Sequence, residues 1–302
     1  MTTPGSIQPA CARRRLGRML AAALMACGLG ASVLAQAAPV QRPLEIPVED
    51  YLGVLASIQA SAHGHPARFL LDTAGGITVV APGFASEQGC VPWGRITGFR
   101  MRGDRLDLQR CDHLELLFAG VPTAAATAGV WDFSAMLPKD APPLAGSVAL
   151  DAFADEVVTL DLGGHRLILE SPASVAARVK TAIEVPAQFS RESGGLGLVP
   201  FIGIKGPHGL LWLELDSGND GALHVARHAA ADLGLAAGVA AWQPAHIEVV
   251  PGLVMGASAN VEDLVVDGNI GAPVLKQWLV TISYKDRRIW IAPRPAPAQP
   301  AA

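Results

Sequence analysis

The sequence predicts an all-β fold built from two tandem copies of one unit, with only a few short helices. Short apolar or alternating runs, each bounded by Gly, Pro or Asp, follow one another along most of the chain, which is typical of strands joined by turns. Stretches with helical spacing are few and short. Two long parts of the chain also resemble each other in sequence, and this indicates a duplicated unit.

The elements can be placed along the chain from these patterns. Each expected strand is β-branched or alternating, and each expected helix is short and covers a sheet. The clearest strands are expected at residues 44–48, 54–60, 68–71, 114–118 and 157–162. Helices are expected at residues 82–88, 171–179 and 225–233.

Length and composition are those of a folded protein with a substantial core. The chain has 302 residues, of which 50% are hydrophobic and 17% charged, enough for one large or two modest domains. The net charge is −4, and the N-terminal segment carries several arginines and no acid, so the rest is more acidic still. No basic patch or interleaving of basic and aromatic residues occurs, which argues against nucleic acid as a partner.

The N-terminus has the pattern of a secretory signal peptide. Arginines at positions 13–18 precede an apolar run at residues 19–34, and the small-x-small triplet Ala35-Gln36-Ala37 follows. We therefore expect residues 1–37 to be cleaved and the chain to be periplasmic or secreted, with no stable membrane insertion afterwards. Two alternatives stay open: an uncleaved membrane anchor, and a lipoprotein site at Cys27 that would leave the chain membrane-anchored.

Of the four cysteines, two fall within the predicted signal peptide. The remaining pair, Cys90 and Cys111, would lie in an oxidising compartment, where a disulfide is the default expectation. The alternative is a pair of buried thiols. Their spacing suits no metal site, and we expect neither a metal nor another cofactor.

The repeat appears as three blocks in the same order. The first is residues 44–47 (LEIP), which return as 183–186 (IEVP). The second is residues 69–73 (FLLDT), which return as 213–217 (LELDS). Three ordered matches are much harder to explain by chance than one.

The third block is the longest, since residues 146–169 align without gaps on residues 268–291. Identical residues recur as Gly146 and Gly268, Val158 and Val280, Thr159 and Thr281, and Arg166 and Arg288. We therefore expect one unit at residues 38–172 and a second at 173–293. Residues 294–302, rich in Pro and Ala, are expected to be a disordered tail.

Each copy places an Asp at the end of an apolar strand, then Thr or Ser, then small residues, and much later an apolar-apolar-Gly turn. This pattern resembles the aspartic-peptidase superfamily, particularly bacterial retropepsin-like proteins fused into one chain. The resemblance covers nearly all of the chain after the signal peptide. It implies a bilobal barrel fold, with Asp72 and Asp216 as the catalytic pair and an extended peptide or unfolded protein as the substrate.

The chemistry explains why the motif should occur twice. Two carboxylates held close together cannot both ionise cheaply, so they share one proton. One then activates water while the other donates to the carbonyl oxygen. The resemblance further implies that the hydroxyl groups of Thr73 and Ser217 brace the opposite loop. It also implies that backbone N–H groups of the supporting loops reach the carboxylates; these loops include Ala74, Gly75 and Gly218.

The first copy departs from the family pattern. Ala74 and Ala149 stand where glycine is expected, while the second copy keeps Gly218 and Gly271. Two functional hypotheses follow. The first is an exported aspartic endopeptidase, expected to be a monomer. The alternative is a catalytically impaired, aspartic-protease-like peptide-binding protein of the cell envelope.

Other features receive simpler interpretations. Residues 95–102, between the two cysteines, could form the hairpin flap that closes over substrate in this family, or an ordinary surface hairpin. His224 and His228 lie four apart on an expected helix, and we interpret them as surface or cap residues rather than metal ligands. The remaining aspartates of interest are interpreted as turn or surface carboxylates: Asp151, Asp161 and Asp220.

Overall fold

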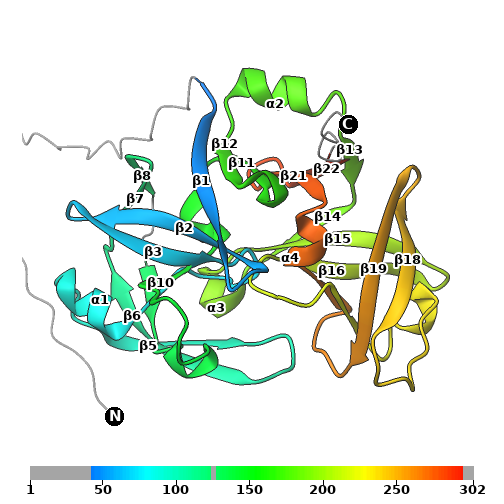
Figure 1. The fold of residues 1–302 in the computed structure, drawn as a ribbon, viewed down its shortest axis with the longest axis horizontal. Helices are drawn as coiled ribbons and strands as arrows, with labels where there is room; N and C mark the ends of the chain where they lie inside the picture. Colours follow the sequence, from blue (N-terminus) through cyan, green and yellow to red (C-terminus); the bar gives the residue numbers. More distant parts are fainter. Residues whose placement is uncertain (1–41, 124–126, 295–302) are drawn as a thin grey trace, which may run out of the picture. The chain divides into compact units, whose positions relative to one another are not determined.

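The computed structural model describes residues 42–123 and 127–294. The predicted signal peptide at residues 1–37 and residues 295–302 of the predicted tail lie outside the described residues. Within the described ranges, no helix is both long and apolar enough to cross a membrane. The structure is mostly β, as the sequence predicts (Figure 1).

Most of the chain is organised in two sheets, one of 15 strands and one of seven. The larger sheet has the order β13 (Ile183–Val185), β22 (Arg288–Pro293), β21 (Trp278–Ser283), β11 (Val157–Asp161), β12 (Arg166–Leu169), β1 (Leu44–Tyr51), β2 (Leu55–Ala62), β3 (His65–Leu71), β10 (Gly146–Val148), β4 (Val79–Val80), β9 (Thr127–Val130), β6 (Arg105–Asp112) and β5 (Trp93–Phe99), while β7 (Leu116–Phe118) pairs with β2 and β8 (Val121–Thr123). The smaller sheet has the order β14 (Ala187–Ser190), β15 (Val199–Gly206), β16 (Gly209–Asp216), β20 (Gly268–Gly271), β17 (Leu223–Ala226), β19 (Leu253–Glu262) and β18 (Gln243–Val250).

The helices are short and connect strands. They are α1 (Pro82–Glu87), α2 (Pro172–Arg178), α3 (Glu192–Gly195) and α4 (Ala272–Leu275), with 3₁₀ turns η1 (Ser134–Met136), η2 (Leu150–Phe153), η3 (Leu162–Gly164) and η4 (Ala231–Leu233). The start of α2 is encoded locally, because the Ser171 hydroxyl accepts the Ser174 N–H and Pro172 occupies the first turn, where its missing N–H costs nothing.

One pattern of strand pairing occurs twice. Strand β3 pairs parallel with β10, β10 antiparallel with β4, and β4 parallel with β9. Strands β16, β20, β17 and β19 repeat these directions in the same order. The flanking strands match too, since β2 and β6 pair antiparallel on one set and β15 and β18 on the other. Asp72, directly after β3, and Asp216, the last residue of β16, therefore hold the same topological position.

A further set of strands joins the two halves of the sequence. Strands β1, β12 and β11 are joined to β21, β22 and β13 through the antiparallel pair β11–β21 (Figure 1). At the centre of this pair Thr159 lies opposite Thr281, and their hydroxyl oxygens are 2.9 Å apart. Residues more than one hundred positions apart thus share one continuous sheet.

The predicted strands are confirmed with small shifts at their ends, as are the helices at residues 82–88 and 171–179. The helix predicted at residues 225–233 is wrong. Val225 and Ala226 belong to β17, which lies between β20 and β19, and every residue of β17 is buried. Burial on both faces removes the alternation that marks a strand, so the short apolar run carried no period that could identify it. Only η4 remains helical there.

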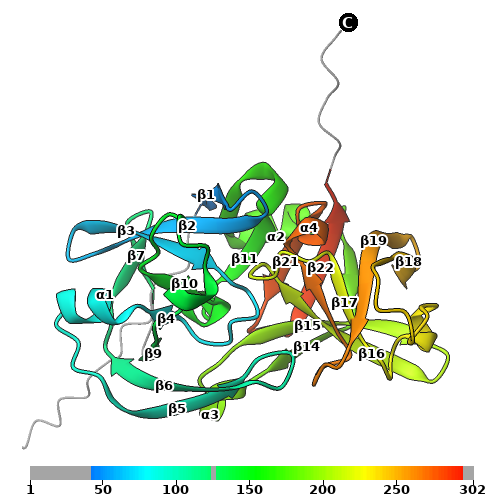
Figure 2. The ribbon, with the colours of Figure 1, turned by 60° about the horizontal axis from the view of Figure 1, so that its bottom comes forward.

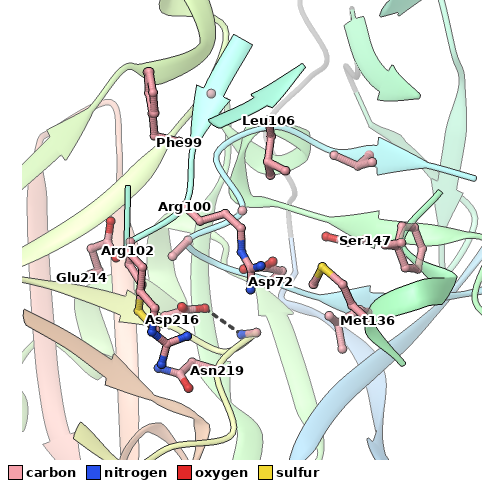
Figure 3. Close-up of a pocket in the computed structure, with 18 of the residues that line it drawn as sticks. Asp72, Phe99, Arg100, Arg102, Leu106, Met136, Ser147, Glu214, Asp216 and Asn219 are labelled. Atoms are coloured by element: carbon pink, nitrogen blue, oxygen red, sulfur yellow. Dashed lines mark hydrogen bonds between the residues drawn. The ribbon is translucent and has the colours of Figure 1, made fainter. Parts of the chain in front are cut away.

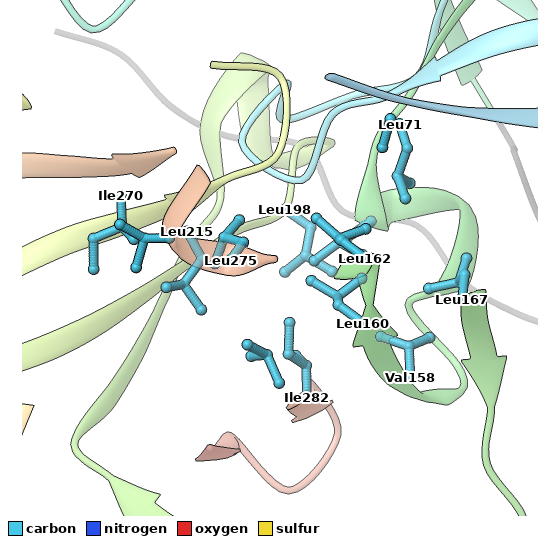
Figure 4. Packing of buried hydrophobic residues seen from close by; sticks show 14 of the residues in the cluster. Leu71, Val158, Leu160, Leu162, Leu167, Leu198, Leu215, Ile270, Leu275 and Ile282 are labelled. Atoms are coloured by element: carbon cyan, nitrogen blue, oxygen red, sulfur yellow. The ribbon is translucent and has the colours of Figure 1, made fainter. Parts of the chain in front are cut away.

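The core is formed by aliphatic side chains from both sheets. Figure 4 shows part of it, where Leu71 and Leu215, the residues before the two motif aspartates, lie in the same cluster as Leu160 and Ile282 of the β11–β21 pair. All four are essentially inaccessible to solvent. Burial of such a side chain stabilises a fold by about 2 kcal/mol, so this packing holds the ends of β3 and β16 firmly in place.

Candidate functional site

Asp72 and Asp216 lie close together in the structure, although they are 144 positions apart in the sequence. Their carboxyl groups share a hydrogen bond. Both side chains line one pocket of about 430 Å³. Figure 3 shows them in this pocket together with Glu214 and Asn219. Each carboxyl group reaches this place because it terminates a strand that pairs in parallel with a second buried strand.

The residues that follow the two aspartates brace each other. The Thr73 hydroxyl donates to the Leu215 carbonyl at 2.5 Å, and the Ser217 hydroxyl donates to the Leu71 carbonyl at 2.6 Å. Each hydroxyl oxygen also accepts the backbone N–H of the other residue, at 3.0 and 3.1 Å. Thr73 and Ser217 are fully buried. Four reciprocal bonds in a water-free setting fix the spacing of the two loops.

Backbone N–H groups point at both carboxyl groups. Gly218 donates to Asp216 Oδ1 at 2.9 Å, and the backbone N–H groups of Ala74 and Gly75 lie near the Asp72 carboxyl group and lower its pKa. The alanine at position 74 therefore keeps the N–H that this position supplies. Its backbone does not adopt a positive φ, so the methyl group imposes no backbone strain.

The two glycines kept in the second copy are required by close contacts. A methyl group at Gly218 would stand 2.5 Å from Asp72 Cγ, and one at Gly271 would stand 1.9 Å from the Gly221 carbonyl oxygen. Ala149, the first-copy counterpart of Gly271, is accommodated in the core with an ordinary extended backbone. The glycine-to-alanine differences of the first copy thus leave the carboxyl pair in place.

The electrostatics of the pair are asymmetric. Burial, followed by the negative charge of Asp216, raises the pKa of Asp72 well above its ordinary value. Burial also raises the pKa of Asp216, but hydrogen bonds from Asn269 and Gly218 oppose this rise. The pKa of Asp72 is therefore raised more than that of Asp216, which favours the shared proton on Asp72.

Two polar residues of the site were missed from the sequence. Glu214 is only 7% exposed, and burial, followed by the charge of Asp216, raises its pKa to about 8. Asn269 is fully buried and contacts both acidic side chains. The repeat carries no signal for them, because the aligned first-copy positions are Leu70 and Ser147.

A long hairpin, β5–β6, has its turn at residues 100–103 (Figure 2). Side chains of this hairpin line the pocket, among them Phe99, Met101 and Leu106. The predicted disulfide between Cys90 and Cys111 is confirmed, and it ties the base of this hairpin. The turn contacts the other side of the pocket: the Val265 N–H donates to the Met101 carbonyl at 2.9 Å, and Arg102 forms two hydrogen bonds with Glu262 at 2.6 and 3.1 Å. The turn of this hairpin is therefore held by contacts with residues 262 and 265.

The histidines at positions 224 and 228 do not form a joint site. His224 is buried in β17, bonds to Glu262 and contacts the edge of Trp242. His228 is exposed and bonds to Asp267 at 2.8 Å. Across residues 42–123 and 127–294, no cluster of three or more His, Cys, Asp and Glu side chains has a metal-binding arrangement.

Two of the three aspartates interpreted as turn or surface groups are more buried than expected. Asp151 accepts hydrogen bonds from the Thr78 N–H and hydroxyl, and burial raises its pKa to about 6. Asp161 is 2% exposed and pairs with Arg166 and Arg294. Only Asp220 is exposed as expected.

Comparison with known proteins places the fold. No family model matches this chain, and no curated protein matches it either. Among solved structures, conglutin gamma, a basic 7S globulin from lupine seeds, is similar with a TM-score of 0.54 and 11% identity, over 84% of this chain and 96% of its own. The basic 7S globulin from soybean is similar with a TM-score of 0.55 and 10% identity, over 84% of this chain and 95% of its own. The structure of edgp is similar with a TM-score of 0.53 and 10% identity, over 85% of this chain and 96% of its own.

At these identities the likeness shows the fold alone. The fold shared with the basic 7S globulins is that of pepsin-like aspartic proteases, so this chain has an aspartic-protease-like fold. The narrower resemblance to bacterial retropepsin-like proteins is not supported by these structures.

Proposed function

We propose that this chain is an aspartic endopeptidase in which Asp72 and Asp216 activate water to hydrolyse a peptide bond. One observation carries the proposal: the two carboxyl groups share a hydrogen bond at the floor of a pocket, in a half-buried setting that keeps one proton between them. A carboxyl pair of this kind supplies an acid and a base at the same time.

The reaction follows from this arrangement. The Asp216 carboxylate accepts a proton from water, the water oxygen bonds to the substrate carbonyl carbon, and Asp72 gives its proton to the carbonyl oxygen. The resulting diol is neutral. Asp216 then returns its proton to the amide nitrogen, Asp72 takes a proton from one hydroxyl, and the C–N bond breaks to give an acid and an amine. The bracing by Thr73 and Ser217 keeps both carboxyl groups in place throughout.

We further infer two lobes that arose by tandem duplication, at residues 38–172 and 173–293, with an extended peptide bound between them. The repeated order and direction of strand pairing support this inference, as does the matching position of the two aspartates. The β5–β6 hairpin would then close over the peptide as a flap. Residues 1–37 support export to the periplasm or beyond, and a monomer without a nucleic-acid partner is the simplest form of such an enzyme.

The second candidate is a catalytically impaired, peptide-binding protein with the same pocket. The similar solved structures favour it over the peptidase, because two of them are named as basic 7S globulins and none as a peptidase. The side-chain geometry favours the peptidase, because the carboxyl pair, its bracing hydroxyls and its N–H donors are all in place.

Digestion of an unfolded protein separates the candidates. The protein without its first 37 residues is incubated with reduced, unfolded substrate between about pH 3 and pH 7, and new N-termini are counted. We expect Asp72→Asn and Asp216→Asn each to lower cleavage by at least about 10³-fold, whereas Asp263→Asn, which changes an exposed aspartate paired with Arg227, leaves it unchanged.

A binding measurement completes the test. A fluorescent peptide whose scissile amide is replaced by a hydroxyethylene group mimics the tetrahedral intermediate. Cleavage by the wild type that is lost in both Asp variants supports the peptidase. Tight binding of the peptide without cleavage of any substrate supports the second candidate, and undiminished cleavage by either Asp variant contradicts the pair mechanism.

A further inference from the structure

Asn269 lies at the centre of β20, one strand away from Asp216, and is fully buried. Its amide nitrogen donates to Asp216 Oδ2 at 2.7 Å and to Glu214 Oε2 at 3.0 Å. Both hydrogens of one amide group are thus directed at two neighbouring carboxyl groups. This contact follows from the register, because Asn269 pairs directly with Glu214 and Gly271 pairs with Asp216.

Hydrogen bonds on the side away from the carboxyl groups fix the orientation of the Asn269 amide. Its oxygen accepts a hydrogen bond from the Asn219 amide nitrogen at 2.7 Å, and the Asn219 oxygen accepts the backbone N–H of Gly221 at 2.9 Å. Because a backbone N–H can only donate, the Gly221 N–H sets the donor and acceptor roles of every hydrogen bond in this series. A flipped Asn269 would turn its oxygen toward the Asp216 carboxylate and its amide nitrogen toward that of Asn219, and it would lose the hydrogen bonds to both.

The other carboxyl group has no such support. In the first copy the paired positions are Leu70 and Ser147, in the same parallel register. Leu70 has no polar group, and in the described structure the Ser147 side chain makes no hydrogen bond to Asp72. Apart from Asp216, the described groups that affect the Asp72 carboxyl group are the backbone N–H groups of Ala74 and Gly75. A side-chain amide donor is therefore aimed at one member of the pair.

We propose that Asn269 is a positioning residue that keeps Asp216 the ionised member of the pair and leaves the shared proton on Asp72. The inference rests on the proposed function, and it deepens it by assigning the base to Asp216 and the acid to Asp72. A donor N–H stabilises a carboxylate more than a neutral carboxyl group, so the member that receives the extra donor gives up the proton.

Glu214 is the neutral partner in this arrangement. Burial raises its pKa to about 8, so it carries no charge at acid and neutral pH and does not repel the Asp216 carboxylate. The other charged or titratable side chains around these groups come from the loops after β3 and β16, from β17, from α3 and from the hairpin turn: Asp72, Asp220, His224, Glu192, Arg100 and Arg102.

The pKa values of the pair can be measured without any activity. Protein labelled with ¹³C at the aspartate side-chain carboxyl carbons is titrated by NMR, and the two resonances are assigned with Asp72→Asn and Asp216→Asn. We expect Asn269→Ala to raise the lower of the two pKa values by about one to two units, since a hydrogen bond to a charged group is worth roughly this much. Ser147→Ala, at the matching register position of the first copy, leaves both values unchanged.

Asn219→Ala provides a milder variant, because it keeps the Asn269 side chain and removes only its orientation. We expect a shift in the same direction but smaller. An unchanged lower pKa in folded Asn269→Ala overturns the inference. Where Asn269→Ala does not fold, an unchanged value in Asn219→Ala overturns it instead.

The pH profile of cleavage gives the functional readout. In Asn269→Ala the acid limb of the kcat/KM profile should move to higher pH by the same one to two pH units. On that limb kcat/KM should fall roughly 10- to 100-fold, with little change at the optimum. If the wild type cleaves no substrate, the proposed function fails, and the NMR titration still decides the role of Asn269.

Discussion

Gly218 lies against the carboxyl group of Asp72, in a contact that crosses from one copy of the motif to the other. A methyl group there would stand 2.5 Å from Asp72 Cγ and within 2.8 Å of both carboxyl oxygens. We expect Gly218→Ala to push the pair apart, lowering kcat/KM by about 10²-fold or more and destabilising the fold by about 1–3 kcal/mol. Steady-state kinetics and urea unfolding measure the two effects.

The matched control is Gly238→Ala, because a methyl group at Gly238 would meet no atom within 4 Å and Gly238 has no positive φ. It should leave both quantities close to those of the wild type. Equal activity of Gly218→Ala and Gly238→Ala would contradict the importance of this contact.

The hydroxyls of Thr73 and Ser217 should contribute to stability as one unit. Thr73→Val and Ser217→Ala each leave two buried backbone groups without their partner, and each should cost about 1–3 kcal/mol. Because the four bonds are reciprocal, the double variant should lose less than the sum, by at least about 1 kcal/mol. Chemical denaturation of the four proteins measures this coupling. Strict additivity would show that the loops are held independently.

Glu214 should make the protein less stable as the pH rises. Its pKa is about 8 in the folded protein against an ordinary 4.5, so the folded state keeps a proton that the unfolded state has released. The stabilisation is complete below the unfolded pKa and is lost as the pH rises through about 8, by at most about 5 kcal/mol in all. Glu214→Gln cannot titrate, so its unfolding free energy should fall less between about pH 4 and pH 8.

Urea unfolding at several pH values tests this expectation, with Glu248→Gln as the control because Glu248 is exposed. Glu248→Gln should follow the wild-type curve. Asp151, whose pKa is raised to about 6 by burial, contributes in the same direction at lower pH and is present in all variants. Parallel curves for the wild type and Glu214→Gln would contradict the assignment.

The ion pair between Arg102 and Glu262 should hold the turn of the β5–β6 hairpin. Its side chains are 46% and 19% exposed, so its effect on global stability should stay below about 1 kcal/mol. Its effect should be local: in Arg102→Ala we expect faster amide hydrogen exchange at residues 100–103 and a higher KM for peptides. Exchange mass spectrometry measures the first quantity.

Arg105→Ala is the matched control in the same hairpin, because Arg105 pairs with Asp107 of its own strand rather than across the pocket. It should leave the exchange of the turn unchanged. Similar acceleration in both variants would mean that the pair with Glu262 has no special role.

The sequence was sufficient to find the carboxyl pair and its bracing hydroxyls, because a motif that occurs twice is visible in the order of residues alone. Asp72, Asp216, Thr73 and Ser217 lie together as predicted. Whether alanine can replace glycine at position 74 depends on the local backbone conformation, which the sequence does not give. In the structure the Ala74 N–H lies near Asp72, and its backbone has no positive φ.

Glu214 and Asn269 could not be predicted in the same way. Each stands where the other copy has a different residue, so the repeat offers no second instance to confirm it. Their contact depends on the register of two parallel strands that are far apart in the sequence. The strand at residues 223–226 was missed for a related reason, because burial on both of its faces is decided by distant strands and leaves no local pattern.

The sheet that joins β11 to β21 also bears on how the chain is made. While residues 278–293 are still being synthesised on the ribosome, β11 of the nascent chain lacks the partner that covers its edge. An unpaired edge is a template for association with other chains. The β11–β21 pair can therefore form only after the second half has emerged, although the other strands of the first half pair among themselves.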